Sequence, residues 1–338
     1  MTDPPSLRFV VPAGVDDPLR VSGGNVYDRH IRDGLRRRGW DVEVCEAADA
    51  GAAASVLRGA PDGSRVLVDG LVAGWAPAAV EEAARRLRLT VLAHMVTASF
   101  PDATGAAIEA ERRALASAHG LIVTSDWTAA ELARRELAEP GRTAVAAPGT
   151  VAAEPCPPPA DEGQLLCVGV IAPHKGQDTL LAALARLRRE EWSCTIAGSS
   201  EASPQFAARI ARQASALGGR VRLTGVLDDR ALDDAYRHCA LLIAPSRVES
   251  SGMAIADARA RGIPVLGAET GGIPDALAAG GGMLVRPDDP AALAAALDAW
   301  LSDPALRARL RREALAARAT LPTWDDTVTR VADVLEAA

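Results

Sequence analysis

Residues 241–258 read LLIAPSRVESSGMAIADA, and this stretch decides the fold class of the second half of the chain. The apolar run at 241–244 has the length of a buried strand, a small polar loop follows, and a segment of helical composition begins near Met253. The loop contains Glu249 and ends in three small residues. These are Ser250, Ser251 and Gly252. Backbone N–H groups at such a helix start can bind a diphosphate.

A second carboxylate, Asp257, follows Glu249 by eight positions and lies on the expected helix. One carboxylate in the loop and one on the helix could each accept hydrogen bonds from two hydroxyl groups, as a sugar and a ribose require. The alternative is a helix-capping or solvated pair without a ligand. A glycine-rich turn at 267–274 follows the next apolar run and fits either close approach of a ligand or an ordinary turn.

Apolar runs alternate with helical segments along nearly the whole chain. The expected strands are 7–11, 41–44, 65–68, 90–93, 121–123 and 144–147 in the first half, and 165–169, 194–197, 221–224, 241–244, 265–266 and 283–285 in the second. Strands that alternate with helices of about 10–15 residues predict βαβ units and parallel sheets covered on both faces.

A proline-rich segment separates two halves of similar size. We predict a Rossmann-like domain at 1–155, a linker at 156–163, a second Rossmann-like domain at 164–320, and a C-terminal helix at 321–338 that can cross back to the first domain. The fold class is therefore α/β, with two doubly wound domains whose parallel sheets face each other across a cleft. Ligands bind outside the carboxyl ends of the strands in such sheets.

The composition limits the classes of function. The 338 residues include 37 basic and 44 acidic side chains, and the net charge of −7 lacks the clustered basic face that nucleic-acid binding needs. The five cysteines have no metal-ligand spacing, so we expect no metal site. The N-terminus has no signal-peptide pattern, and no apolar run reaches the roughly 18 residues of a membrane span. We expect a cytoplasmic protein without stable membrane insertion; its oligomeric state stays open.

Lys175 follows the strand expected at 165–169 and precedes a helix, with Gly169 at the strand end. A lysine at this place can act as a point charge on a phosphate, assisted by the N–H groups of the helix. The alternative is a surface lysine in an ordinary loop. The order of residues differs from a Walker loop, in which Gly-Lys-Ser/Thr is required.

Five motifs occur in order through the second half: Gly-x5-Lys-Gly (169–176), Ala-Gly-Ser (197–199), Arg-Leu-Thr-Gly (222–225), Pro-Ser-x2-Glu-x7-Asp (245–257) and Gly-Gly-Ile-Pro (271–274). Together they resemble the donor domain of glycosyltransferase family 4. The resemblance implies a retaining, hexosyltransferase-like enzyme of GT-B architecture. It would use a nucleoside diphosphate sugar as donor, and neither a further cofactor nor a metal ion.

By this resemblance, Glu249 contacts hydroxyl groups of the donor sugar, Asp257 holds the ribose, and Lys175 binds the diphosphate. The remaining donor-binding candidates are Gly23, Gly24, Gly169, Gly198, Val226, Ser250, Ser251, Gly252 and Met253. Of these, Gly198 and Val226 match positions where the base rests against backbone and apolar surface.

Two positions depart from the family pattern. The family usually has Glu where this chain has Asp257, which is one methylene shorter and puts the ribose contact in doubt. An arginine usually follows the strand glycine, and this chain has Val170 instead. The diphosphate charge would then rest on Lys175, on helix N–H groups and on Arg247, whose place the sequence does not fix.

The first half supplies the expected acceptor side. Two glycines, Gly23 and Gly24, open a helix after the first strand, which matches the glycine loop of the family in position. His94 ends the strand at 90–93; it is either a structural residue or the catalytic histidine that the resemblance places against the donor sugar. The acceptor-binding candidates are Asp16, Arg20, Asn25, Thr97 and Ser125. Ser125 is first of all a helix N-cap.

We therefore expect a retaining glycosyltransferase with His94, Lys175 and Glu249 as catalytic residues and a small soluble acceptor. Transfer would occur by front-side attack as the diphosphate departs. The alternatives are a non-catalytic or degenerate sugar-nucleotide-binding protein and a GT-B sugar-nucleotide epimerase. A nicotinamide-dependent enzyme is disfavoured because no Gly-x-Gly-x-x-Gly follows the strand at 7–11. The donor sugar, the base and the acceptor are not set by these residues.

Overall fold

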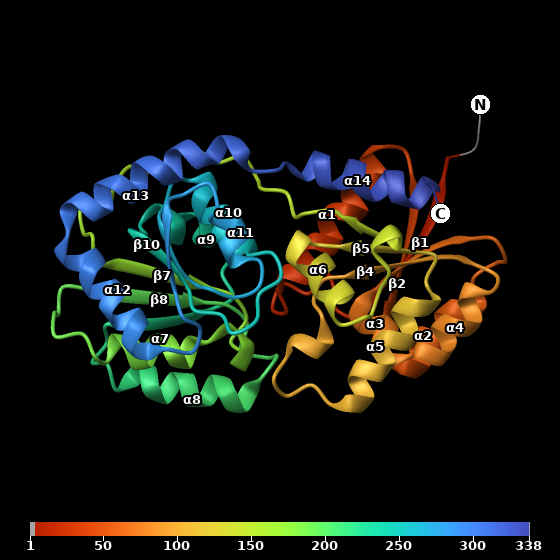
Figure 1. Cartoon of the computed structure of the whole chain (residues 1–338), viewed down its shortest axis with the longest axis horizontal. Helices are drawn as coiled ribbons and strands as arrows, with labels where there is room; N and C mark the ends of the chain where they lie inside the picture. Colours follow the sequence, from red (N-terminus) through yellow and green to blue (C-terminus); the bar gives the residue numbers. More distant parts are fainter. Residues whose placement is uncertain (1–3, 338) are drawn as a thin grey trace. The chain divides into compact units, whose positions relative to one another are not determined.

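The computed structural model describes residues 4–337, which form two compact α/β units (Figure 1). Within that range, unit 1 comprises residues 4–17, 24–149 and 322–337, and unit 2 comprises residues 18–23 and 150–321. Each unit contains one six-stranded sheet in which all strand pairs are parallel. The expectation of an α/β fold with two parallel sheets is confirmed.

Unit 1 follows the alternation of strands and helices. Its strands are β1 (Ser6–Pro12), β2 (Asp41–Ala47), β3 (Arg65–Asp69), β4 (Arg88–Ala93), β5 (Gly120–Val123) and β6 (Thr143–Val145). Its α-helices are α1 (Gly23–Arg37), α2 (Ala50–Gly59), α3 (Gly70–Trp75), α4 (Pro77–Ala84), α5 (Gly105–Ser117), α6 (Asp126–Arg134) and α14 (Trp324–Ala337). Two 3-10 turns, η1 (Thr97–Ser99) and η2 (Pro140–Arg142), lie in its loops.

Unit 2 repeats the same plan. Its strands are β7 (Gln164–Val168), β8 (Ser193–Ala197), β9 (Val221–Gly225), β10 (Leu241–Ala244), β11 (Val265–Ala268) and β12 (Gly282–Val285). Its α-helices are α7 (Gln177–Leu184), α8 (Pro204–Ser215), α9 (Asp229–Arg237), α10 (Met253–Ala260), α11 (Ile273–Ala276), α12 (Pro290–Ser302) and α13 (Pro304–Ala317). The 3-10 turns are η3 (Pro173–Lys175) and η4 (Arg318–Thr320). Each of the strands predicted from the sequence is present.

The strand orders place a ligand-binding position in each sheet. Unit 1 has the order β2-β1-β3-β4-β5-β6, and unit 2 has the order β12-β11-β10-β7-β8-β9. The direction of winding therefore reverses between β1 and β3 in unit 1 and between β7 and β10 in unit 2. Loops leave in opposite directions at such a switch point, which opens a crevice beyond the carboxyl ends of the two strands.

Helices cover both faces of the unit 2 sheet (Figure 1). One core cluster packs the sheet against α7, α8 and α12 through Leu180, Ile210 and Leu297. Another packs it against α9, α10 and α11, with Tyr236 and Ile255 buried. The strands β10 and β11 are apolar without alternation because both faces are covered in this way.

The units differ from the predicted domain boundaries in two segments. Residues 18–23 belong to unit 2, where the Ser199 hydroxyl donates a hydrogen bond to the carbonyl of Leu19 at 2.9 Å. Residues 150–155 also belong to unit 2, where they pack with the segment that includes Arg318. These contacts join residues 180 and 165 positions apart in the sequence, so composition gave no signal for them.

The C-terminal helix α14 belongs to unit 1. Gly34 on α1 leaves space for Val328 of α14, since a Cβ atom at Gly34 would lie 2.3 Å from its Cγ2 atom. Trp324 stacks on His30 with ring centroids 3.9 Å apart. Among the residues described here, no helix is both long and apolar enough to cross a membrane.

Candidate functional site

The candidate donor-binding residues of unit 2 lie at its switch point. Lys175 is on the loop after β7, and Glu249 is on the loop after β10, the strand that pairs directly with β7. The Lys175 Nζ atom lies 2.7 Å from the Glu249 Oε2 atom. Both side chains are mostly buried, with exposed fractions of 22% and 13%. The residue predicted to bind the diphosphate, Lys175, and the residue predicted to bind the sugar, Glu249, thus form one ion pair.

Further polar groups surround this pair. The hydroxyl group of Ser246 donates to Glu249 Oε2 at 3.4 Å, and the N–H of Gly252 donates to Glu249 Oε1 at 3.3 Å. A pocket in unit 2 is lined by these residues, by Lys175 and by Gln177, with apolar walls from β7, β10 and α10. Gln177 is fully buried, and its Oε1 atom has no hydrogen-bond partner in the structure.

Electrostatics keep Glu249 ionised. Burial by itself would raise the pKa of Glu249, but the charge and the hydrogen bond of Lys175 outweigh burial and lower the pKa below its ordinary value. A buried carboxylate stays charged only where it is paired in this way. The site therefore holds one fixed negative and one fixed positive group in contact.

Two glycines of the turn after β11 fix the loop that carries Glu249. A Cβ atom at Gly271 would lie 1.7 Å from the carbonyl oxygen of Glu249, and one at Gly272 would lie 2.1 Å from that of Ser250. The N–H of Gly272 donates to the Glu249 carbonyl at 2.9 Å. The turn thus supports the neighbouring loop by close backbone packing, and Gly252, with φ at +70°, completes that loop before α10 begins at Met253.

The strand ends of β7 and β8 also meet through glycine. A Cβ atom at Gly198 would lie 1.9 Å from the carbonyl oxygen of Gly169, and the aliphatic stem of Lys175 packs beside Gly169. Gly198 donates a hydrogen bond from its N–H to the carbonyl of Gly225, just before Val226. The predicted base-binding positions therefore lie at adjacent strand ends, where Gly198 is required by packing before any ligand is considered.

Asp257 does not join the pocket that Lys175 and Glu249 line. It lies in the second turn of α10, and burial raises its pKa to about 6, partly offset by the charge of Arg261. Ser251 is half-buried at the end of the loop, and Ser250 is buried. Its raised pKa lets Asp257 become neutral in mildly acidic solution.

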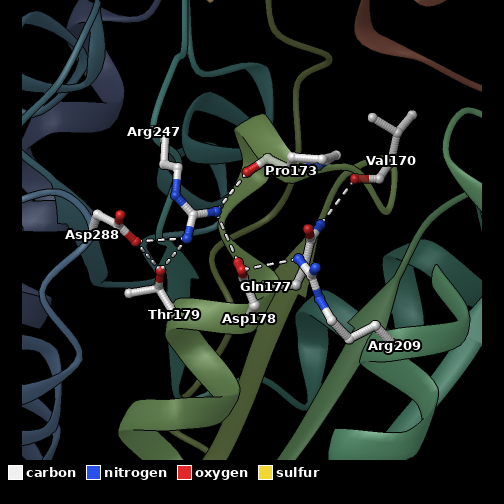
Figure 2. A network of polar contacts seen from close by, with 8 residues as sticks. All are labelled: Val170, Pro173, Gln177, Asp178, Thr179, Arg209, Arg247 and Asp288. Atoms are coloured by element: carbon white, nitrogen blue, oxygen red, sulfur yellow. Dashed lines mark hydrogen bonds and ion pairs between the residues drawn. The ribbon is translucent and has the colours of Figure 1, made fainter. Parts of the chain in front are cut away.

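The guanidinium of Arg247 is hydrogen-bonded to groups of the protein itself. It donates to Asp178 Oδ1 at 2.8 Å, to Asp288 Oδ1 at 2.6 Å and to the carbonyl of Pro173 at 2.7 Å (Figure 2). These acceptors bind the guanidinium of Arg247, whose position the sequence did not predict. Lys175 is the basic residue among those that line the pocket, and it is also the only lysine in the sequence.

Unit 1 holds a second cluster of charged residues near its own switch point. His94, directly after β4, has its Nε2 atom 2.9 Å from Asp28 Oδ1 and 3.3 Å from Asp69 Oδ2. Asp28 lies on α1, and Asp69 ends β3 and caps α3 by accepting hydrogen bonds from Leu71 and Val72. Sequence reasoning singled out His94 and missed both carboxylates.

The cluster favours a protonated histidine. Burial would lower the pKa of His94, but the charge and hydrogen bond of Asp28, with those of Asp69, raise it above its ordinary value. Burial raises the pKa of Asp28, whose Oδ2 atom is buried without a hydrogen-bond partner. An imidazolium whose Nε2–H donates hydrogen bonds to carboxylates has no ring lone pair left to act as a base.

Asp28, Asp69 and His94 are also the one group among residues 4–337 whose ligand atoms could surround a cation, since those atoms lie within 4.8 Å of one another. A proton on His94 Nε2 already serves both carboxylates at hydrogen-bond distance. The structure therefore accounts for the cluster by an ion pair, and independence from metal stays a prediction.

The other acceptor-side candidates are distributed over unit 1 and the 18–23 segment. Ser125 caps α6 by accepting a hydrogen bond from Thr128, which confirms the N-cap prediction. Thr97 lies in η1 after β4, and its N–H donates to Glu111. Asp16 pairs with Arg32 at 2.6 Å.

The remaining candidates lie at the start of α1 and just before it. Gly24 packs against the ring of His94, and Gly23 and Asn25 flank it in the first turn of α1. Arg20 belongs to unit 2, where it lies 3.9 Å from Glu201.

Comparisons with known proteins agree with this architecture. Residues 154–316 match the family Glycosyl transferases group 1. The D-inositol 3-phosphate glycosyltransferase of Streptomyces avermitilis is 35% identical over 251 residues, which are 68% of this chain and 54% of that protein. D-inositol 3-phosphate glycosyltransferase 2 of Catenulispora acidiphila is 33% identical over 256 residues, which are 69% of this chain and 59% of that protein. The chain spans about half the length of the curated relatives it matches.

Solved structures share the fold over nearly the whole chain. Sucrose-phosphate synthase from Thermosynechococcus elongatus is similar with a TM-score of 0.83 at 21% identity, covering 98% of both chains. HepE of Anabaena, in complex with UDP and glucose, is similar with a TM-score of 0.75 at 19% identity, covering 98% of this chain and 99% of that one. The chain therefore belongs to the glycosyltransferases of GT-B fold, and its residues 154–316 form their group 1 domain.

Proposed function

We propose that this protein transfers a sugar from a nucleoside diphosphate sugar to a hydroxyl group of a small soluble acceptor, with retention of anomeric configuration. The observation that carries the proposal is the Lys175–Glu249 ion pair at the switch point of unit 2. A donor presents both matching partners: diphosphate oxygens for the ammonium and sugar hydroxyls for the carboxylate. Each residue can exchange its present partner for the corresponding part of the donor.

The main catalytic contribution is stabilisation of the leaving diphosphate. Negative charge grows on the diphosphate as the glycosidic bond breaks, and Lys175 is a fixed positive charge beside it. The N–H groups at the start of α10, after Gly252, add aligned dipoles. Donors that are fixed before the reaction cost no reorganisation during it, which makes such electrostatic terms large. The departing phosphate oxygen takes the proton of the acceptor hydroxyl as that hydroxyl attacks the same face.

His94 acts as a hydrogen-bond donor in this proposal. Asp28 and Asp69 hold it as an imidazolium, so its remaining ring N–H can only donate to a hydroxyl group or to developing negative charge. A general-base role is disfavoured because the ring has no lone pair in this state. The two carboxylates are then positioning residues that set the orientation and protonation of His94.

UDP sugars are the first donors to examine, since a structural neighbour holds UDP and glucose, and the curated relatives act on D-inositol 3-phosphate. The decisive experiment measures release of nucleoside diphosphate from a panel of UDP, GDP and ADP sugars, with and without polyol acceptors. We expect release that depends on an acceptor and a product with the donor's anomeric configuration by NMR. A product of opposite configuration would contradict retention, and no turnover with any donor would contradict the transferase proposal.

Val170 favours one second candidate, a sugar-nucleotide-binding protein without transferase activity. Lys175 bears the diphosphate charge without the arginine that the family pattern usually supplies, and Arg247 is committed to other acceptors. A nucleoside diphosphate sugar would raise the melting temperature of such a protein, because a ligand that binds only the folded state stabilises that state. The protein would show neither hydrolysis nor transfer, and the Val170→Arg variant would tighten binding without producing turnover.

A further inference from the structure

Arg247 joins three loops at the carboxyl edge of the unit 2 sheet (Figure 2). It lies on the loop after β10, and its Nη1 atom donates to the Pro173 carbonyl and to Asp178 on the β7 side. Its Nη2 atom donates to Thr179 at 3.0 Å and to Asp288 in the loop before α12. Each terminal nitrogen thus makes two hydrogen bonds, and the side chain has only 21% of its area exposed.

The third loop depends on this contact. Asp288 has φ at +56°, a left-handed conformation that is uncommon for a residue with a side chain. Thr179 also donates to Asp288 Oδ1 at 2.9 Å, and the hydrogen bond of Arg247 is the largest cause that lowers the pKa of Asp288. The carboxylate is therefore held ionised in a conformation that needs partners to persist.

Arg247 contacts the two residues before Lys175, and its neighbour Pro245 packs against the residue after it. The backbone N–H of Arg247 donates to the carbonyl of His174 at 2.7 Å, while its guanidinium holds the carbonyl of Pro173. On the other side, a Cβ atom at Gly176 would lie 2.1 Å from the carbonyl of Pro245. The loop that bears Lys175 is therefore hydrogen-bonded at Pro173 and His174, and packed at Gly176, against the loop that bears Glu249.

We propose that Arg247 is a positioning residue that holds Lys175 at the diphosphate and opposite Glu249, and that it does not contact the donor itself. This inference rests on the proposed function. Its four side-chain hydrogen bonds would have to break before the guanidinium could bind a phosphate. Arginine suits this bridging task because its planar donors are arranged in a fixed fork, which lysine lacks.

A double-mutant cycle tests the proposal with UDP, GDP and ADP as ligands in calorimetry. We expect Lys175→Met to weaken binding, and Arg247→Met to weaken it about tenfold, the lower end of the affinity loss found when a group that orients a ligating residue is removed from a metal site. In the Lys175→Met background, Arg247→Met should have no further effect, because neighbours that act through one another are not additive. Arg247→Lys should recover only part of the loss.

Arg209 offers a matched control. It also contacts Asp178, at 3.4 Å, but its side chain is 51% exposed and reaches neither of the other loops. Arg209→Met should therefore bind the nucleotides like the unaltered protein. Melting curves of all variants check that unit 2 remains folded.

A second measurement uses Lys175 as the only lysine in the sequence. Reductive methylation with 13C-formaldehyde keeps the charge and gives one lysine signal, distinct from the N-terminal amine. We expect Arg247→Met to shift this signal without any ligand, and Arg209→Met to leave it unchanged. An unmoved signal in Arg247→Met, or a loss of affinity that persists without Lys175, would overturn the positioning role.

The cycle also separates this inference from the proposed function. Weaker binding in Lys175→Met with unchanged binding in Arg247→Met would overturn the positioning role alone. Unchanged nucleotide binding in Lys175→Met would overturn the diphosphate site itself, and the role of Arg247 with it.

Discussion

The two units place charged groups at equivalent points of their sheets but balance the charges differently. In unit 2, one ammonium meets one carboxylate, Lys175 with Glu249 at 2.7 Å. In unit 1, one imidazole meets two carboxylates, His94 with Asp28 at 2.9 Å and Asp69 at 3.3 Å. The first arrangement is neutral and can exchange both partners for an anionic and a hydroxyl-rich ligand. The second has an excess of negative charge and holds its histidine in one state.

Burial agrees with this contrast. The side chains of Asp28 and Asp69 are 1% and 6% exposed, whereas those of Lys175 and Glu249 are 22% and 13% exposed and line a pocket. Removing one partner of a buried pair leaves an unpaired charge, which is strongly unfavourable. A pair that must open for a ligand is therefore better placed where that ligand can enter, and a pair that fixes a side chain is better placed in the interior.

The largest effect is expected when Lys175, the cation of the Lys175–Glu249 pair, is removed. Lys175→Ala should lower kcat about 100- to 1000-fold, the range measured when one fixed donor to developing negative charge is removed from an enzyme. Steady-state kinetics measure the change, and circular dichroism checks that the fold persists. Activity equal to that of the unaltered protein would remove Lys175 from the diphosphate site.

Loss of the carboxylate Glu249, in contrast, should not weaken binding of a nucleoside diphosphate that carries no sugar. Glu249→Gln frees Lys175, so we expect UDP to bind at least as tightly as to the unaltered protein. Transfer should fall because the sugar hydroxyls lose an ionised acceptor. Calorimetry with UDP and with the UDP sugar separates the two effects. Equal losses of affinity for both ligands would contradict the division of roles between Lys175 and Glu249.

A smaller, pH-dependent effect is expected in unit 1. Asp28 raises the pKa of His94, so activity that needs the imidazolium should fall only as the pH rises through that raised value. Asp28→Asn should lower kcat about tenfold and move the alkaline fall to lower pH, since a lost carboxylate no longer favours the charged ring. The pH profile of kcat/KM measures the shift; an unchanged alkaline limb would separate His94 protonation from catalysis.

The same linkage has a consequence for stability. Because the folded-state pKa of His94 lies above its unfolded value, its ion pairs stabilise the fold fully below the ordinary histidine pKa of about 6.5. That contribution is lost as the pH rises through the raised pKa. Between pH 6.5 and the raised pKa, the free energy of unfolding measured with urea should fall less with rising pH in Asp28→Asn than in the unaltered protein.

The smallest effect is expected at Asp257. Its pKa is raised to about 6, so protonation below that pH should weaken nucleotide binding about fivefold, the difference between a charged and a neutral hydrogen-bond acceptor. Asp257→Asn should bind weakly at every pH and show no such dependence. Unfolding is not the cause, because a raised folded-state pKa makes protonation of Asp257 favour the folded protein. A flat profile in the unaltered protein would place the ribose elsewhere.

The sequence predicted the fold well because the deciding signals are local. Runs such as 241–244 are apolar throughout, so each strand of the two covered sheets could be located without its neighbours. Lys175 and Glu249 could also be found, since each follows a strand and the family pattern fixes their spacing. Their contact follows from topology, because β7 and β10 are adjacent at the switch point.

The rest depended on tertiary contacts. Asp28 lies within a polar helical stretch and meets His94 across 66 positions, so nothing nearby marks it as buried. Asp69 had a weak signal, an acidic residue at a strand end before a glycine. Arg247 could not be placed because its acceptors, Asp178 on α7 and Asp288 in the loop before α12, lie 69 and 41 positions away in the sequence.

The most direct test of the account follows the 13C-methylated Lys175 signal while UDP and then a UDP sugar are added. We predict that UDP shifts the signal and that the shift saturates, because the ammonium leaves Glu249 for the diphosphate. Glu249→Gln should give a different starting position and the same end point. A signal that stays unchanged while the protein transfers sugar from that donor would contradict the claim that the Lys175–Glu249 pair is the donor site.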